Sequence, residues 1–189
     1  MTPHISVIIP AYHAHETIAR AVASIRNAGV PLAQVQVVIA PDDGRDYTYL
    51  AGQAQNITIA TSAEVRSGAG PARNRALQAA KADYVAFLDA DDTWEDLYLA
   101  ELLPLAQKFG AAFGSTSILD QGQEILRLPL QNSLSFADFA RSGASFHPVV
   151  ARTHRGARTR RSIDRGVVVP GVSFLAERDV RQIMSTTTA

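Results

Sequence analysis

The sequence predicts an α/β protein whose central sheet is mainly parallel and is covered by helices on both faces. Three observations support this prediction. Short apolar runs alternate with segments of helical periodicity as far as Gly110. Each run is apolar at nearly every position, which is typical of strands buried on both faces. The runs end in polar loops rich in Asp, Gly and Pro, the residues that favour turns.

The apolar runs are short enough to be strands, and the segments between them carry apolar residues three and four positions apart, as helices do. Strands are predicted at Ile5–Ile9, Val35–Ile39, Ile57–Ala60 and Tyr84–Leu88. Helices are predicted at Thr17–Asn27, Tyr47–Gln53, Ala72–Lys81 and Glu95–Phe109, the last with a kink at Pro104. Beyond Gly110 the pattern weakens, and we expect strands at Ala111–Ile118 and Val167–Val169 and helices at Leu134–Arg141 and Ala176–Met184.

Composition and charge narrow the class of protein. The 189 residues are 47% hydrophobic, enough for one sizeable core, and the formal net charge of zero argues against nucleic acid as a partner. The absence of cysteine excludes disulfides and thiolate metal sites. No apolar run approaches the about 18 residues of a membrane span, and the first residues do not resemble a signal peptide. We therefore expect a cytoplasmic protein, with peripheral contact at the inner face of the membrane left open; its oligomeric state is not predicted.

The strand at Tyr84–Leu88 leads directly into three carboxylates, Asp89, Asp91 and Asp92. These charges repel one another, so the cluster is costly without a cation. Ions such as Mg²⁺ are usually held by one or two carboxylates together with substrate phosphates. Open α/β sheets also bind ligands at the carboxyl ends of their strands. A ligand site is therefore favoured over the alternative, a solvated acidic turn or helix cap.

Other polar loops follow neighbouring strands and are expected to meet this cluster. Residues 10–16 and 42–46 come after the first two predicted strands, and parallel strands end at one edge of a sheet. Residues 68–71 precede a helix whose first turn offers free N–H groups, with Arg73 and Arg75 beside them. Carboxylates for a cation and a basic helix start for phosphates together indicate a metal-bridged diphosphate.

These motifs resemble the N-terminal part of a family 2 glycosyltransferase of the GT-A fold, in the nucleotide-diphospho-sugar transferase superfamily. The resemblance covers about residues 4–110, and four motifs in the family's order and spacing carry it: Val7–Tyr12, Asp42–Gly44, Ala72–Leu77 and Phe87–Trp94. It implies a Rossmann-like three-layer sandwich. It also implies a metal-dependent, inverting hexosyltransferase that moves a sugar from a nucleotide-diphospho-sugar, such as a UDP-sugar, to the hydroxyl of a sugar or lipid-linked acceptor. Cell-envelope polysaccharide (cell wall biogenesis) or glycolipid synthesis is the implied setting.

The resemblance assigns the base pocket to five residues. Pro10, Ala11 and Tyr12 are expected to flank the nucleotide base. Asp42 is expected to accept a hydrogen bond from the base, and Asp43 to shape the same pocket. The family usually has Asn at the position of His13 and often Glu at that of His15. These imidazoles are either partly titrating groups or exposed loop histidines.

The resemblance assigns the phosphates and the cation to four residues. Arg73 is expected near the diphosphate. Asp89 and Asp91 form a D-x-D element that holds the sugar nucleotide and a Mn²⁺ or Mg²⁺ ion, and Asp92 is a further candidate ligand. Such an ion offsets the charge that builds up on the departing nucleoside diphosphate, so the sugar–oxygen bond breaks more easily.

The acceptor side is predicted in the rest of the chain. Relatives place a general base about ninety residues beyond the D-x-D element, which makes Asp179 the first candidate and Glu177 the second. The alternative is two surface acids on a terminal helix. Residues 1–110 are thus expected to be the nucleotide-sugar-binding half. Residues 111–189 are expected to be a divergent or truncated acceptor portion, partly disordered around 152–165.

The arginines of residues 152–165 and the motif at Asp89 leave further alternatives open. Six arginines within these fourteen residues form either a solvated loop or a patch for an anionic lipid-linked acceptor or a membrane. The chain could also be a remnant that binds a nucleotide sugar without transferring it. Asp89–Thr93 matches the D-x-D-x-T motif of haloacid-dehalogenase-like phosphatases, but that family usually carries the motif on its first strand.

Overall fold

The computed structural model describes residues 4–52, 56–109, 111–120, 123–128, 133–134, 150–152 and 166–177. Its α-helices are α1 (Ile18–Ser24), α2 (Ala69–Ala79) and α3 (Tyr98–Phe109), and short 3-10 helices lie at Ile25–Asn27, Leu32–Gln34 and Thr48–Gly52. Its strands are β1 (Ile5–Ala11), β2 (Val35–Pro41), β3 (Ile57–Ile59), β4 (Tyr84–Phe87), β5 (Asp92–Trp94), β6 (Ala111–Asp120), β7 (Gln123–Leu128), β8 (Ser133–Leu134), β9 (Val150–Arg152) and β10 (Gly166–Glu177). None of the helices in these ranges combines the length and the apolar character that crossing a bilayer requires.

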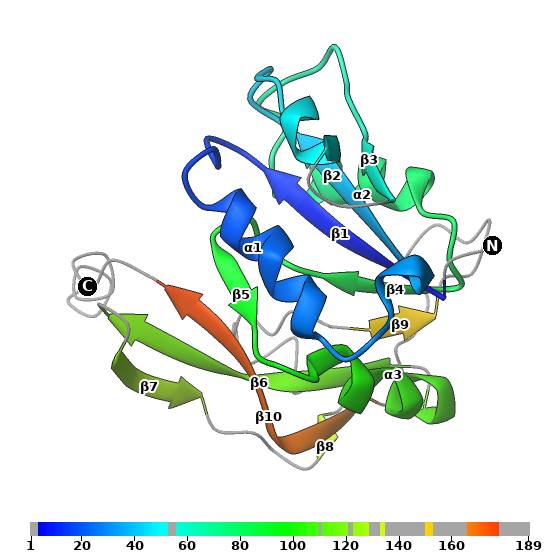
Figure 1. Ribbon diagram of the computed structural model, residues 1–189, viewed down its shortest axis with the longest axis vertical. Coiled ribbons are helices and arrows are strands. Elements are labelled where there is room, and N and C mark those ends of the chain that lie inside the picture. The colour runs from blue at the N-terminus through cyan, green and yellow to red at the C-terminus, as the bar shows by residue number, and fades with distance from the viewer. Residues whose placement is uncertain are drawn as a thin grey trace.

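Within the described residues the strands form one ten-stranded sheet in the order β3-β2-β1-β4-β9-β6-β10-β5, with β7 paired to β6 and β8 to β10. Strands β3, β2, β1 and β4 are parallel, so the predicted α/β fold with a parallel sheet is confirmed there (Figure 1). Beyond β4 the pairing is mixed. Strand β9 is antiparallel to both β4 and β6, whereas β10 is parallel to β6 and antiparallel to β5.

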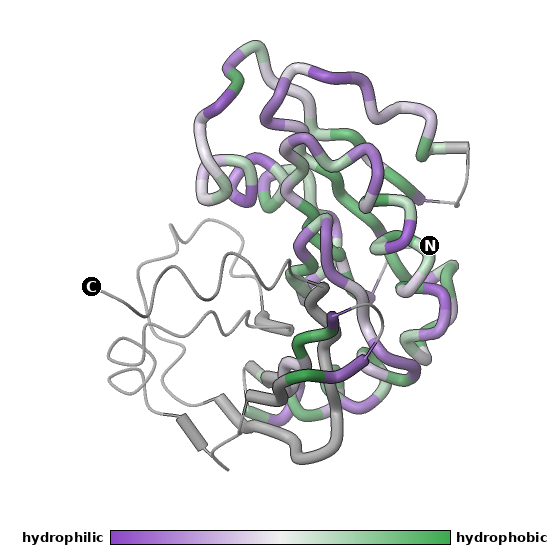
Figure 2. Tube along the Cα trace, turned by 90° about the vertical axis from the view of Figure 1, so that its left-hand side faces the viewer, coloured by the Kyte–Doolittle hydropathy of each residue, from purple (hydrophilic) through white to green (hydrophobic). Residues whose placement is uncertain are grey.

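Different helices cover the two faces of the parallel strands. Val7 and Val37 belong to the larger core cluster, which includes residues of α1 and α3. Ile8 and Val38, one position further along each strand, pack with Ala72 of α2 on the opposite face. Because both faces are covered, β2 is buried at all seven positions, which explains its continuous apolar run. Figure 2 shows the hydrophobic segments inside this part and hydrophilic segments along the outer loops.

A buried polar pair anchors the end of α2 to the sheet. The hydroxyl of Ser6 donates a 2.7 Å hydrogen bond to Gln36 Oε1, which also accepts the N–H of Lys81. Gln36 Nε2 donates to the carbonyl oxygen of Ala79, and Ser6 Oγ accepts the N–H of Ala82. These bonds satisfy backbone groups where the chain leaves α2 for β4, so they help to direct the start of α2 toward the opposite edge of the sheet.

Gly29 allows the turn after α1 to pack closely against α3. Its φ of +81° lies in the left-handed region, where a side chain is strained, and a Cβ there would lie 2.6 Å from Ala100 Cβ. The same turn accepts backbone hydrogen bonds from α3 and the residue before it, because Leu97 N–H donates to Asn27 O and Leu99 N–H to Ala28 O. Glycine is therefore required here by both conformation and space.

Three elements differ from their predictions for identifiable reasons. The helix predicted at Tyr47–Gln53 is a 3-10 helix at Thr48–Gly52, because Tyr47 is buried and held by side-chain hydrogen bonds. Helix α2 begins three residues early, since Pro71 is tolerated in a first turn. Strand β5 was not predicted, because its partner is the distant β10.

The prediction of a helix from Ala176 is wrong at its first two residues. Ala176 and Glu177 end β10, where they pair with Ile118 and Leu119 of β6, so strand pairing overrides a weak helical pattern. The remainder of that segment lies outside the described residues. Leu134 lies in β8 rather than in a helix, and residues 135–141 are not described. Arg152 ends β9, and residues 153–165 of the arginine-rich segment also lie outside the described part.

Candidate functional site

A pocket of about 570 Å³ lies where the carboxyl ends of β1, β2 and β4 meet the start of α2. It is lined by residues 10–14, Thr17, Asp42, Arg66, 68–69, 72–73 and 89–91. Its volume is in the range of small-molecule sites. The three strand-end loops that the sequence predicted to converge therefore do meet, and Asp42 and Asp91 share one cavity.

The first wall of the pocket is the loop after β1. Pro10, Ala11 and Tyr12 all line the cavity, as does His13, whose φ of +52° is left-handed. Tyr12 is 51% exposed and meets the His13 ring edge-on, with centroids 4.2 Å apart. An exposed aromatic ring at a pocket wall is a surface on which a planar base can stack.

Asp43 fixes this loop from outside the cavity. Its Oδ2 accepts the N–H of His13 at 2.8 Å and the hydroxyl of Tyr47 at 2.9 Å, while Oδ1 accepts the N–H of Arg45. The Tyr47 hydroxyl in turn accepts the N–H of Ala14 at 3.1 Å. Burial raises the pKa of Asp43, but these hydrogen bonds outweigh it and lower the pKa. Asp43 is not among the lining residues, so it shapes the pocket through the loop.

Tyr47 and His15 form an aromatic group behind the same loop. Their ring centroids are 4.3 Å apart, and Tyr49 stacks on His15 at 5.9 Å. Burial raises the pKa of Tyr47 to about 12, with the Asp43 carboxylate acting in the same direction. The hydroxyl therefore stays protonated at neutral pH and can donate to Asp43 while accepting from Ala14. His15 does not line the pocket.

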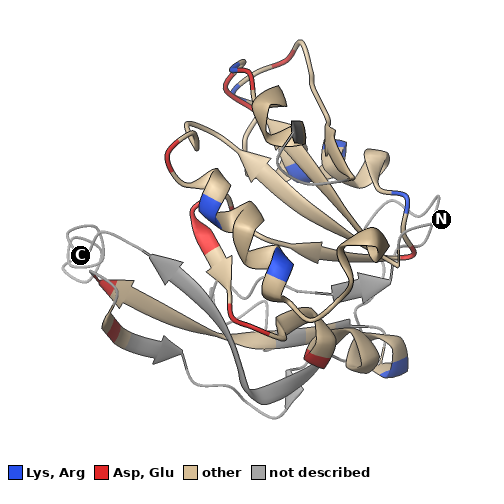
Figure 3. Ribbon diagram, in the orientation of Figure 1, with Lys and Arg blue, Asp and Glu red and all other residues tan. Residues whose placement is uncertain are grey.

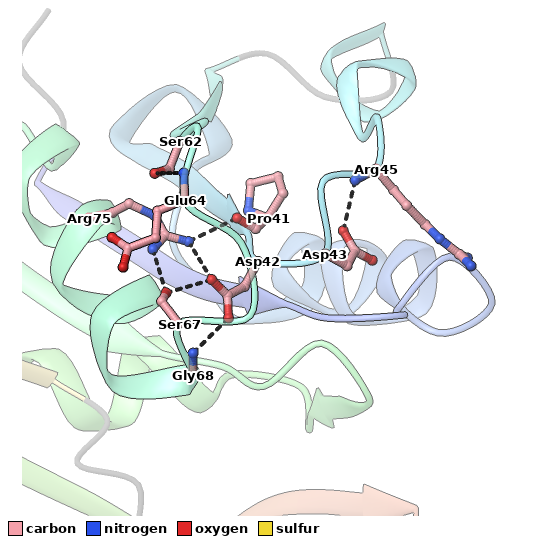
Figure 4. Close-up of polar contacts among 9 residues, drawn as sticks. All are labelled: Pro41, Asp42, Asp43, Arg45, Ser62, Glu64, Ser67, Gly68 and Arg75. Atoms are coloured by element: carbon pink, nitrogen blue, oxygen red, sulfur yellow. Dashed lines mark hydrogen bonds and ion pairs between the residues drawn. The ribbon is translucent and has the colours of Figure 1, made fainter.

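Asp42 joins the end of β2 to the loop before α2 (Figure 4). Its Oδ1 accepts the Ser67 hydroxyl at 2.6 Å and Arg75 Nη2 at 3.0 Å, and its Oδ2 accepts the N–H of Gly68 at 2.7 Å. Its backbone takes part too, because its carbonyl oxygen accepts the N–H of Arg66. Burial raises the pKa of Asp42, but these donors outweigh it and lower the pKa to about 2.

The opposite wall carries the predicted phosphate and cation residues. Arg73 Nη2 lies 2.7 Å from Asp89 Oδ1, and both residues line the cavity. Asp91 follows on the exposed turn between β4 and β5, and Arg20 of α1 donates a 3.3 Å bond to its carbonyl oxygen. Figure 3 shows the acidic segment at the start of β5 close to the basic segment of α1. Both aspartates thus line the cavity, and the carboxylate of Asp89 is paired with Arg73.

Asp92 lies elsewhere. It is 5% exposed on β5 and does not line the pocket. It acts on the buried Tyr98, whose pKa is raised well above its usual value by burial and further by the charge of Asp92. The ring of Tyr98 stacks on Trp94 at 5.0 Å. The geometry therefore associates Asp92 with the core beneath the turn.

The donor set of this wall suits a hard divalent cation that arrives with phosphates. Asp89 and Asp91 offer carboxylate oxygens at the cavity surface. No group of three or more His, Cys, Asp or Glu that could hold a metal occurs among the described residues. Two carboxylates with the remaining positions supplied by phosphate and water is the usual arrangement for Mg²⁺, so the residues fit a Mn²⁺ or Mg²⁺ ion bound together with a diphosphate.

The acceptor-side candidates are placed only in part. Ala176 pairs with Asp92, so the backbone of Glu177 follows beside the D-x-D turn. Because β10 is parallel to β6, and both β6 and β4 are antiparallel to β9, β10 ends at the same sheet edge as β4. Asp179 lies outside the described residues.

Arg66 lines the pocket and was missed by the sequence predictions, whereas Gly68 was expected in the phosphate loop at residues 68–71 but not against Asp42. Arg66, with φ +56°, and Gly68, with φ +99°, flank Ser67 on the loop before α2. Their signal was an arginine and a glycine just ahead of a helix start, but nothing local indicated that the loop folds back onto Asp42. That contact joins residues 26 positions apart, so it depends on the fold.

The fold and this pocket define a GT-A-type α/β domain, and comparison with solved structures supports this class. TarS 1–349 of S. aureus in complex with UDP-GlcNAc matches with a TM-score of 0.72 at 17% identity, over 93% of this chain and 58% of that one. The sequence profile described as glycosyl transferase family 2 matches residues 6–167, which is more than half of the chain. The chain belongs to glycosyl transferase family 2. This membership overturns the phosphatase alternative.

The curated relatives are more similar in sequence to this chain than TarS is, and they are longer than this chain. The amylovoran biosynthesis glycosyltransferase AmsB of Erwinia amylovora is 30% identical over 140 residues, which are 67% of this chain and 46% of AmsB. WfgD of Escherichia coli, a UDP-Glc:alpha-D-GlcNAc-diphosphoundecaprenol beta-1,3-glucosyltransferase, is 34% identical over 93 residues, 48% of this chain and 36% of WfgD. This chain therefore spans less than half the length of either relative.

Proposed function

We propose that the protein transfers a sugar from a UDP-sugar, held with Mn²⁺ or Mg²⁺, to a hydroxyl of a sugar or lipid-linked acceptor, with inversion. One observation carries the proposal. A single pocket is lined by the exposed ring of Tyr12, the buried carboxylate of Asp42, Arg73 and the carboxylates of Asp89 and Asp91. Asp42 follows β2 and Asp89 follows β4, so they come from opposite sides of β1, and this gives the pocket a base end and a phosphate end. A nucleotide base, a diphosphate and a bound cation require these groups in this order. The family membership also supports the proposal.

The base end of the pocket recognises shape and hydrogen bonding. Tyr12 offers its ring to the face of the base, with Pro10 and Ala11 beside it. Asp42 is ionised and acceptor-only, so it favours a base that presents an N–H group. Uracil has such a group, and the complex of TarS with UDP-GlcNAc is consistent with a uridine donor.

The phosphate end of the pocket neutralises negative charge. Arg73 provides a planar guanidinium for diphosphate oxygens, which it reaches by exchanging its contact with Asp89. Asp89 and Asp91 hold the cation, and Asp92 supports their turn from the core. When bound, the ion stabilises charge on the departing UDP.

The acceptor lies on the side of β10 and the segment that follows. We propose residues 1–110 as the nucleotide-sugar-binding half and residues 111–189 as the acceptor portion. Asp179 is the first candidate for the base that removes the acceptor proton, and Glu177 is the second, supported by its place beside the D-x-D turn. The name of WfgD favours a diphosphoundecaprenol-linked acceptor. The setting that we propose is cell-envelope polysaccharide synthesis at the inner face of the membrane.

The test separates donor binding from transfer. UDP release from UDP-glucose and UDP-GlcNAc is measured with Mn²⁺, and UDP binding is followed through Trp94, the single tryptophan, which lies close to the D-x-D turn. Asp91→Asn is expected to lose metal-dependent UDP binding, whereas Asp96→Asn, an exposed neighbour outside the cavity, is the matched control.

Asp179→Asn or Glu177→Gln is expected to keep UDP binding and to lower turnover about 10²–10⁴-fold, the usual contribution of a general base. A wild-type chain that binds UDP with Mn²⁺ but releases none from any sugar donor would instead be the binding remnant. Failure to bind any nucleoside diphosphate with either ion would reject both functions.

A further inference from the structure

Arg75 lies behind the pocket, where its guanidinium group connects three partners. Nη1 donates to Ser67 Oγ at 2.9 Å, and Nη2 donates to Pro41 O at 2.9 Å and to Asp42 Oδ1 at 3.0 Å (Figure 4). The side chain of Arg75 is 18% exposed and that of Asp42 is 4% exposed. Neither Arg75 nor Ser67 lines the cavity, so Arg75 reaches the ligand only through Asp42.

The partners of Arg75 form a closed ring of contacts. Ser67 accepts from Arg75 and donates to Asp42, while Asp42 also accepts the N–H of Gly68. Both carboxylate oxygens are therefore held, and neither can rotate without breaking a charge-assisted bond. Gly68 belongs to the pocket rim, so the same ring fixes both an acceptor and the edge beside it.

We propose that Arg75, with Ser67, is a positioning residue that clamps Asp42 and the Ser67–Gly68 turn into a preformed acceptor for the nucleotide base. The inference rests on the proposed function, since it requires the pocket to hold a nucleotide. The planar guanidinium group of Arg75 suits this role because it donates hydrogen bonds in fixed directions to the hydroxyl of Ser67, the carbonyl oxygen of Pro41 and the carboxylate of Asp42. Preorganised groups bind better because less order is lost on binding.

The clamp acts at the base end of the pocket only. It therefore predicts a different experimental result from a general structural role of Arg75. UDP uses both ends of the pocket, whereas pyrophosphate with Mn²⁺ uses the Arg73 and Asp89 end alone. Arg75→Met and Ser67→Ala are expected to weaken UDP binding about tenfold or more, as for loss of a hydrogen bond to a charged group. Their affinity for pyrophosphate with Mn²⁺ should stay within about twofold of the wild type.

Two further measurements distinguish a positioning role of Arg75 from a role in folding. Arg75→Lys keeps the charge without the planar guanidinium group and should recover part of the UDP affinity. In Arg75→Met the pKa of Asp42 rises, so the acid limit of UDP binding should move to higher pH than in the wild type. The other charged or titratable groups that line the cavity are unchanged in this variant: Tyr12, His13, Arg66, Arg73, Asp89 and Asp91. Gln78→Met, an exposed change on the same helix, is the control.

Wild-type affinity for UDP in a folded Arg75→Met chain would overturn the clamp, and so would equal weakening of UDP and pyrophosphate. If Arg75→Met fails to fold, Ser67→Ala, which removes one hydroxyl, decides the question by the same two affinities. A wild-type chain that binds pyrophosphate with Mn²⁺ but not UDP would overturn the base role while leaving the phosphate site intact. A wild-type chain that binds neither would overturn the proposed function, and the clamp with it.

Discussion

At the scale of single residues, adjacent aspartates in one motif have separate tasks. Asp42 lines the pocket and holds the loop before α2, whereas Asp43 lies outside it and holds the loop after β1. Both have lowered pKa values because hydrogen-bond donors outweigh burial. The sequence identified the pair, and the resemblance to the family gave the hydrogen bond with the base to Asp42 and the shaping of the same pocket to Asp43. In the structure only Asp42 of the pair lines the cavity, because the Asp43 carboxylate instead accepts the N–H of His13 and the hydroxyl of Tyr47 behind the loop.

The lowered pKa of Asp42 predicts a pH-dependent contribution to stability. The folded pKa of about 2 lies below the ordinary 3.8, so folding favours the ionised form. The contribution of about 2 kcal/mol is complete above about pH 4 and is lost as pH falls through about 2. Asp42→Asn should therefore lower the free energy of unfolding by about 2 kcal/mol at neutral pH, measured by urea denaturation.

The difference between the wild type and Asp42→Asn should shrink as the pH is lowered from about 4 toward 2. Asp96→Asn, which is exposed, provides the control and should show little change at any pH. A constant difference between wild type and Asp42→Asn across this range would contradict the assignment of that stability to an ionised Asp42.

At the scale of elements, the site depends on how helices are fastened to the sheet. The pair of Ser6 and Gln36 anchors the end of α2, while Asp42 anchors the loop at its start. Helix α2 thus presents its first turn, with Arg73, to the cavity. On the other face, the glycine turn after α1 lets α3 approach closely.

Gly29 gives the sharpest prediction at this scale. Gly29→Ala places a Cβ 2.6 Å from Ala100 Cβ at a φ of +81°, so both a clash and backbone strain result. We expect a loss of about 2–3 kcal/mol in the free energy of unfolding, measured by thermal or urea denaturation. Gly70→Ala is the matched control, because it lies within α2 with no atom within 4 Å of the added Cβ.

Alanine is a better helix former than glycine, so Gly70→Ala should be neutral or slightly stabilising. Adding Ala100→Gly to Gly29→Ala removes the 2.6 Å contact but leaves those with Leu97 at 3.1 and 3.2 Å, so it should recover part of the loss. An unchanged melting temperature in Gly29→Ala would show that α3 can shift without cost, contrary to this account.

At the scale of the whole molecule, ligand and cation should stabilise the fold together. The pocket is built from the ends of β1, β2 and β4 and the start of α2, so a ligand in it links segments far apart in sequence. UDP with Mn²⁺ should raise the melting temperature by an amount that corresponds to about 2.7 kcal/mol at about 100 times Kd. Chelation with EDTA should remove most of this gain.

UMP provides the control for this experiment, because it keeps the base but lacks the second phosphate that a bridging cation requires. A gain from UDP that persists in EDTA would show that the metal is not needed for binding. Equal gains from UMP and UDP would place the ligand at the base end alone.

The sequence determined the parallel α/β half and the convergence of its loops. Strands that are apolar throughout and end in polar turns can be buried only in a sheet covered on both faces, and parallel strands end at one edge. The positions of Pro10, Asp42 and Asp89 around one cavity followed from that pattern. Local signals were sufficient because each of these residues lies at the end of its own strand or within two residues of it.

Only the tertiary structure decided which side chains face the cavity and which hold it from behind. Arg75 and Asp43 lie outside it, Arg66 and Gly68 lie on its wall, and Asp92 belongs to the core beneath. The strand at Asp92–Trp94 likewise exists because β10 returns beside it. These outcomes depend on contacts between residues that are tens of positions apart in the chain. A local sequence pattern gives no information about the energy of such contacts.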